Sequence, residues 1–127
     1  MRKQCHNPYM PLWEHVPDGE PHVFGDRLYV YGSHDLENGN EFCEQDYVCW
    51  SAPVTDLSDW RRDGVIYKKE QDPYNQDALP LYAPDVVKGP DGRYYLYYCI
   101  KFQDSINVAV FDTPAGEYRF YGRVHYE

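Results

Sequence analysis

Three acidic residues are candidates for acid–base catalysis. Asp18 and Glu20 stand two residues apart in the turn PDGEP, residues 17–21, and Asp85 lies in the sequence APDV further along. Two carboxylates about 6.5–9.5 Å apart can hydrolyse a glycosidic bond, because one activates water while the other protonates the leaving oxygen. A third carboxylate can tune the pKa of the acid. These residues therefore suggest acid–base hydrolysis if the fold gathers them. Taken alone, each could equally cap a turn.

The elements that must position these acids begin with a predicted hairpin. A short apolar strand, residues 22–24, is followed by the turn Gly25-Asp26 and by a longer strand, residues 27–33. Turn residues between two runs of period-two apolar residues are typical of a hairpin. The second strand returns toward the start of the first. Ser33, His34 and Asp35 are therefore expected on the same rim as Asp18 and Glu20.

The pattern continues as two similar four-stranded units. Further strands are expected at 47–50 and 64–67 in the first unit, and at 83–88, 93–100, 106–111 and 118–122 in the second. The segments that begin at Pro21 and Pro84 share a frame and lie 63 residues apart. The sequence therefore predicts an internal repeat, with one unit over about 17–68 and the other over about 81–123.

The composition of the strands favours a β-propeller. Both alternating faces of residues 94–100, YYLYYCI, are apolar or aromatic, so the sheet must be covered on both sides. A sandwich would instead show polar residues on one face. We predict an all-β protein with two antiparallel blades. The innermost strands of both blades are expected to place their acidic residues at one opening of the central channel, its mouth. Two blades cannot close a ring, so residues 1–127 are expected to be the N-terminal part of one domain, or a protomer that completes itself by assembly.

The net charge and the spacing of the cysteines argue against several classes of partner and ligand. Asp plus Glu total 21 against 12 Lys plus Arg, a net charge of -9, which argues against nucleic acid and anionic membranes as partners. Cys5, Cys43, Cys49 and Cys99 lack zinc-site spacing, so no metal site is predicted. No apolar leader or membrane-spanning run is visible, and we expect a cytoplasmic protein unless a signal peptide has been removed.

Several motifs together resemble glycoside hydrolase family 43. They are NPYMP at residues 7–11, PDGEPHV at 17–23 and YAPDV at 82–86. The resemblance implies a five-bladed propeller acting on β-xylosides and α-L-arabinofuranosides by inversion, and it matches only the first two blades. It assigns Asp85 as the aspartate that tunes the acid. For the base, strand position favours Glu20, whereas residue type favours Asp18, which we slightly prefer.

The family's general acid, a glutamate from a later blade, has no counterpart here, because Glu117 is expected far from the mouth. The resemblance therefore implies a glycosidase whose 127 residues alone are inactive, with the remaining blades supplied in cis or by self-assembly. No cofactor is expected, and a channel cation, as in some members, would take its ligand from a later blade. The alternative is a non-catalytic carbohydrate-binding or assembly module.

Four residues are predicted to line the pocket of an oligosaccharide substrate. His34, Asp35 and Phe102 lie at or just beyond the ends of second strands, where Lys101 is a further candidate. Trp13 precedes the acidic turn, either as an aromatic platform beside the site or as a plug beneath the first strand.

Overall fold

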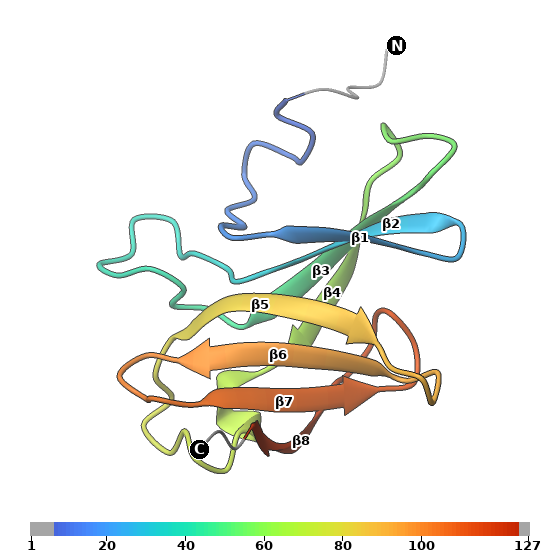
Figure 1. Ribbon diagram of the computed structural model, residues 1–127. Coiled ribbons are helices and arrows are strands. Elements are labelled where there is room, and N and C mark those ends of the chain that lie inside the picture. The colour runs from blue at the N-terminus through green and yellow to red at the C-terminus, as the bar shows by residue number, and fades with distance from the viewer. Residues whose placement is uncertain (1–6, 125–127) are drawn as a thin grey trace.

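The computed structural model describes residues 7–124, so Cys5 lies outside the described part. Its strands form two four-stranded antiparallel sheets, each with its strands in chain order (Figure 1). The first sheet consists of β1 (Glu20–Phe24), β2 (Arg27–Gly32), β3 (Tyr47–Pro53) and β4 (Arg61–Tyr67). The second consists of β5 (Leu81–Lys88), β6 (Tyr94–Ile100), β7 (Ile106–Phe111) and β8 (Arg119–Val124). The predicted all-β architecture of two four-stranded units is confirmed.

Helical structure between residues 7 and 124 is limited to a three-residue 3-10 turn, Lys69–Gln71, between the two sheets. Within the same residues, no helix has the length and apolar character needed to cross a membrane.

The hairpin of β1 and β2 forms as the sequence predicts. Gly25 has a φ of 63°, a conformation that glycine adopts without steric cost and that tight hairpin turns require. Glu20 pairs with Tyr31, and Phe24 pairs with Arg27 at the turn. The start of β1 therefore lies beside the end of β2. The acidic turn and the residues that follow β2 are thus at the same end of the sheet.

The corresponding ends of the two sheets lie on the same side of the molecule, on the left in Figure 1, and we call this side the rim. The β2–β3 connection, residues 33–46, and the β6–β7 connection, residues 101–105, both emerge there. The ammonium of Lys101 in the second connection pairs with the carboxylate of Glu41 in the first. This ion pair joins loops from the two sheets across the rim.

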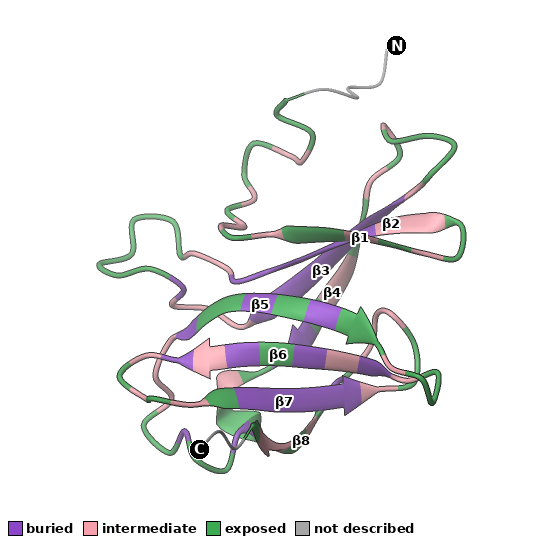
Figure 2. Ribbon diagram, viewed as in Figure 1, coloured by how far each residue is buried: buried purple, intermediate pink, exposed green. Residues whose placement is uncertain are grey.

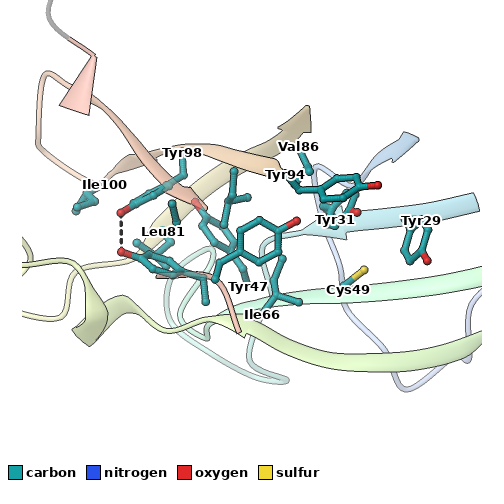
Figure 3. Close-up of a cluster of buried hydrophobic side chains, with 14 residues drawn as sticks. Tyr29, Tyr31, Tyr47, Cys49, Ile66, Leu81, Val86, Tyr94, Tyr98 and Ile100 are labelled. Atoms are coloured by element: carbon teal, nitrogen blue, oxygen red, sulfur yellow. Dashed lines mark hydrogen bonds between the residues drawn. The ribbon is translucent and has the colours of Figure 1, made fainter. Parts of the chain in front are cut away.

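Seven of the 14 buried residues that form the core between the sheets are tyrosines (Figures 2 and 3). Tyr29 and Tyr31 of β2 and Tyr94 and Tyr98 of β6 belong to one cluster of buried residues, in which Tyr31 lies near Tyr94. Tyr67 and Tyr98 are also hydrogen-bonded through their hydroxyl groups at 2.8 Å. Burial raises the pKa of Tyr98, so its hydroxyl remains neutral and available for hydrogen bonds. The tyrosine-rich composition therefore serves packing, with the hydroxyl groups satisfied inside the core.

The innermost strand of the second sheet differs from the prediction. β5 begins at Leu81 instead of residue 83, and its pairing with β6 shifts register between Tyr82 and Asp85. Pro84 lies in this irregular stretch, and proline cannot donate a backbone hydrogen bond to a ladder. Asp85 therefore lies in the middle of β5, directly after the irregularity, and not at the start of the strand.

Candidate active site

The Asp18/Glu20 turn is exposed at the rim. Asp18 lies in the turn before β1 with a φ of 54°, a left-handed conformation that aspartate tolerates better than most residues. The backbone oxygen of the preceding Pro17 accepts a hydrogen bond from Oγ of Ser33 at 3.2 Å. Glu20 begins β1 and is also exposed. Both carboxylates are thus open to solvent, on a turn that is fastened to the residue after β2.

Asp85 contacts the strand that begins with Glu20. Its Oδ1 lies 2.6 Å from Nε2 of His22 in β1 and accepts the backbone N–H of Val86 at 2.8 Å. The side chain of Asp85 is 60% exposed and that of His22 is 33% exposed. The pair therefore bridges the two sheets and leaves most of the Asp85 carboxylate accessible.

Glu20 and His22 are two residues apart on β1 and point to the same face of the sheet. Two residues of a strand span roughly 7 Å. Asp85, held on His22, therefore contacts β1 two residues along the strand from Glu20. The fold brings acidic groups from both sheets to one strand.

Three of the four predicted substrate-binding residues share a pocket. Trp13, His34 and Asp35 line a pocket of about 290 Å³, together with Glu14, His15, Leu36, Glu37, Gln45 and Arg62. The ring of Trp13 is 65% exposed and packs 5.8 Å from that of Trp50, so Trp13 is no buried plug. Oδ1 of Asp35 accepts the backbone N–H of Cys43 at 2.7 Å, which fixes the β2–β3 connection.

Phe102 is not part of that pocket. It lies in the β6–β7 connection of the second sheet, 87% exposed and with a φ of 63°. The ammonium of Lys101 lies 4.8 Å from the centre of the Phe102 ring. The hydrogen bond from Lys101 to Glu41 raises the pKa of this ammonium, so it stays charged at neutral pH.

Sequence reasoning missed two residues of this region, His22 and Glu14. The sequence pattern places His22 in a short apolar strand, although a polar residue two positions after Glu20, on the same face of the strand, is a signal for a site residue. Glu14 is almost completely buried, and its Oε2 accepts a hydrogen bond from Nε1 of Trp50 at 2.8 Å. Trp50 lies 36 residues further along the chain, and nothing in the local sequence indicates this contact.

Other parts of the described chain offer less chemistry. A hollow of about 430 Å³ is lined by Asn7, Tyr9, Pro21, Leu28, Val30, Leu57 and Trp60, and no carboxylate is among them. Glu117 lies in the β7–β8 connection, beside Ile66 and Tyr67 of β4. Residues 7–124 contain no group of three histidine, cysteine, aspartate or glutamate side chains placed to hold a metal ion.

Comparison with known proteins gives consistent matches. No protein-family model matches the chain. A xylosidase/arabinosidase of Thermoclostridium stercorarium is 63% identical over 127 residues, which are 99% of this chain and 27% of the relative. Xylosidase/arabinosidase 43A of Humicola insolens is 34% identical over 124 residues, or 85% of this chain and 36% of that protein.

Solved structures agree in fold. A GH43 β-xylosidase/α-arabinofuranosidase from a compost microbial metagenome, in complex with xylotriose, matches with a TM-score of 0.73 and 28% identity, over 94% of this chain and 38% of that one. A GH43 enzyme from Xanthomonas citri complexed with xylotriose matches with a TM-score of 0.72 and 27% identity, over 87% of this chain and 33% of that one. The chain thus spans between 27% and 38% of the length of these four proteins.

Proposed function

Because the chain belongs to glycoside hydrolase family 43, as a portion covering 27% to 38% of its relatives, we propose that it supplies two neighbouring blades of a sugar-cleaving propeller. In this proposal residues 1–127 are the N-terminal part of one catalytic domain, with blade 1 over about 17–68 and blade 2 over about 81–123. The substrates are oligosaccharides of the xylan or arabinan type. The remaining blades come from the same polypeptide or from further copies of the chain.

The proposed reaction is hydrolysis with inversion at the anomeric carbon. A carboxylate of the Asp18/Glu20 turn takes a proton from water while the water oxygen bonds to that carbon. The bond to the leaving oxygen breaks, and this oxygen receives its proton from an acid outside this chain. Asp18 is the preferred base, because the longer side chain of Glu20 would shift the water. Asp85 tunes and orients the acid.

The proposed substrate contacts come from the residues that surround the rim. Trp13, His34 and Asp35 line one pocket, in which an exposed indole face suits a sugar ring. Phe102 offers a second exposed aromatic face on the other sheet. The net charge of -9 is compatible with a neutral oligosaccharide.

One observation carries this proposal above all. The 2.6 Å contact between His22 and Asp85 holds a carboxylate of the second sheet on the strand that Glu20 begins. Chain topology alone would permit acids at opposite ends of two sheets, where they could not act on one bond. The contact supports a shared site.

The proposal is tested with aryl β-xylosides and aryl α-L-arabinofuranosides. The 127 residues alone should show near-background turnover, because loss of general acid catalysis costs roughly 10² to 10⁴ in rate. Turnover should appear when the reading frame that follows Glu127 is included, and Asp85→Asn in that longer chain should abolish most of it.

Robust turnover by the 127 residues alone would contradict the half-site assignment. Saturable binding of xylo-oligosaccharides that Asp85→Asn leaves unchanged, with no cleavage by the longer chain, would favour the second candidate, a non-catalytic carbohydrate-binding or assembly module. The exposed indole of Trp13 is the observation that favours this candidate.

A further inference from the structure

A buried carboxylate fastens the N-terminal segment, residues 7–19, to the first sheet. The side chain of Glu14 is 1% exposed. Its Oε2 accepts the indole N–H of Trp50 at 2.8 Å and lies 3.6 Å from Nε of Arg62, while its Oε1 pairs with Nε2 of His34. These partners belong to β3, to β4 and to the residues after β2. A single carboxylate therefore ties the segment to three successive parts of the sheet, and its burial is tolerated because it is hydrogen-bonded and paired.

Close packing continues this attachment toward the acidic turn. A Cβ atom added at Gly32, the last residue of β2, would clash with Cγ1 of Val16. A Cβ atom added at Gly19 would lie 2.8 Å from Cγ1 of Val30. Both glycines thus allow an approach that any larger residue would prevent. The segment fits closely against β2 on both sides of Asp18.

Backbone oxygen atoms complete the attachment. The backbone N–H of Asp35 donates to the oxygen of His15 at 2.9 Å, and Oγ of Ser33 donates to the oxygen of Pro17 at 3.2 Å. The four residues 14–17 are therefore all anchored to the end of β2 or its neighbours, and Asp18 follows directly. Asp18 itself is exposed, so its location is set by this anchored segment on one side and by β1 on the other.

We propose that Glu14 is a positioning residue, which acts through the docked segment to place the carboxylate of Asp18 for the reaction. This inference rests on the proposed function. The carboxylate of Glu14 is 1% exposed and already occupied by Trp50 and His34, so its effect on Asp18 is transmitted through residues 15–17. Because a misplacement of about 1 Å can cost roughly 100-fold in rate, a partly released segment should lower kcat strongly.

The test uses two unrelated ways of loosening the segment. Glu14→Gln removes the charge shared by Trp50, His34 and Arg62, and Gly32→Ala forces Val16 out of its contact. The double variant Gly32→Ala/Val16→Ala removes the clashing methyl groups and should restore docking. Gly122→Ala is the control, because a Cβ atom there meets no atom within 4 Å.

Two readouts are needed. Hydrogen exchange of the Asp35 amide in the 127-residue chain reports docking directly, because this amide donates to His15. It should accelerate in Glu14→Gln and Gly32→Ala and recover in the double variant. In the longer chain, kcat should fall by about tenfold or more in both single variants and return to within about threefold of the starting value in the double variant. KM is measured alongside, because Trp13 of the segment and His34 are proposed substrate contacts.

The outcomes separate this inference from the proposed function. Faster exchange at Asp35 with unchanged kcat would overturn the positioning role and leave the hydrolase intact. A rise in KM with kcat unchanged would overturn it as well, because the loosened segment would then affect only the substrate contacts of Trp13 and His34 and not the placement of the acid. Unchanged exchange in Gly32→Ala would disprove the docking itself. Absence of turnover in the unsubstituted longer chain would overturn the proposed function, and the positioning role with it.

Discussion

His22 and Asp85 occupy equivalent positions in the two repeats of this chain, and their side chains meet at 2.6 Å. The two residues are 63 positions apart, which is also the spacing between Pro21 and Pro84. Equivalent positions on the innermost strands of neighbouring propeller blades lie side by side around the central channel. The contact thus agrees with a radial arrangement. It also shows that Asp85 is matched in the repeat by a histidine, so the acids of the two sheets are staggered and not equivalent.

The His22–Asp85 pair should contribute little to stability. Because its side chains are 33% and 60% exposed, solvent screens the interaction, and a coupling energy of about 0.2–1 kcal/mol is expected. A double-mutant cycle of His22→Ala and Asp85→Asn, measured by urea unfolding of the chain, checks this value. A coupling above about 2 kcal/mol would mean that the pair holds the sheets together.

Asp18→Asn and Glu20→Gln distinguish the two candidate bases. In the longer chain Asp18→Asn should reduce kcat by roughly 10² to 10⁴, because the water loses its proton acceptor, whereas Glu20→Gln should have a much smaller effect. Steady-state kinetics with an aryl xyloside measures both. The reverse order of effects would assign the base to Glu20.

Asp72→Ala should be strongly destabilising. The carboxylate of this residue, 2% exposed, accepts hydrogen bonds from the Tyr98 hydroxyl at 2.5 Å, the Asn107 amide at 2.8 Å and the backbone N–H of Tyr74 at 2.7 Å. Its removal leaves the buried donors of Tyr98 and Asn107 unsatisfied, each at about 1–3 kcal/mol, so a loss of about 2–6 kcal/mol is expected. Thermal or urea unfolding measures it.

Tyr67→Phe is the matched control for that experiment, because it removes the 2.8 Å hydrogen bond to the Tyr98 hydroxyl and leaves the Asp72 carboxylate in place. It should lose about 0.5–1.5 kcal/mol. Equal losses in the two variants would show that the carboxylate is not the centre of this network.

Gly116→Ala should destabilise the second sheet. A Cβ atom at this position would clash with the ring of Phe111 at the end of β7, so the ring must move out of the core, at about 1–3 kcal/mol. Gly122→Ala in β8 meets no atom within 4 Å and should change the free energy of unfolding much less. Chemical denaturation of both variants makes the comparison, and similar losses would contradict it.

Asp91 should make stability depend on pH under acidic conditions. Hydrogen bonds from Tyr95 at 2.6 Å and from Arg93 at 2.8 Å lower the pKa of Asp91 from 3.8 to about 2. Because the folded state favours the ionised carboxylate, the contribution of this group is complete above pH 3.8 and is lost as pH falls through about 2. The difference in unfolding free energy between the natural chain and Asp91→Asn should shrink over that window. A difference that stays constant down to about pH 2 would contradict the assignment.

The two sheets follow from local sequence patterns. Period-two runs such as residues 94–100, the Gly25-Asp26 turn and the 63-residue repeat were sufficient to predict two antiparallel four-stranded units, because strand alternation and turn chemistry are local properties. The sequence also located the Asp18/Glu20 turn beside the residues after β2, since a hairpin must return its chain.

The side-chain contacts between distant segments, in contrast, are set by how the whole chain packs. The register shift at Pro84 moved Asp85 into the middle of β5 and onto His22, and the burial of Glu14 under Trp50 and His34 joined segments up to 36 residues apart. Such contacts depend on how sheets and loops pack together, and the residues involved carry no local pattern that specifies a distant partner. For that reason the acids could be recognised in the sequence, whereas the residues that hold them required the fold.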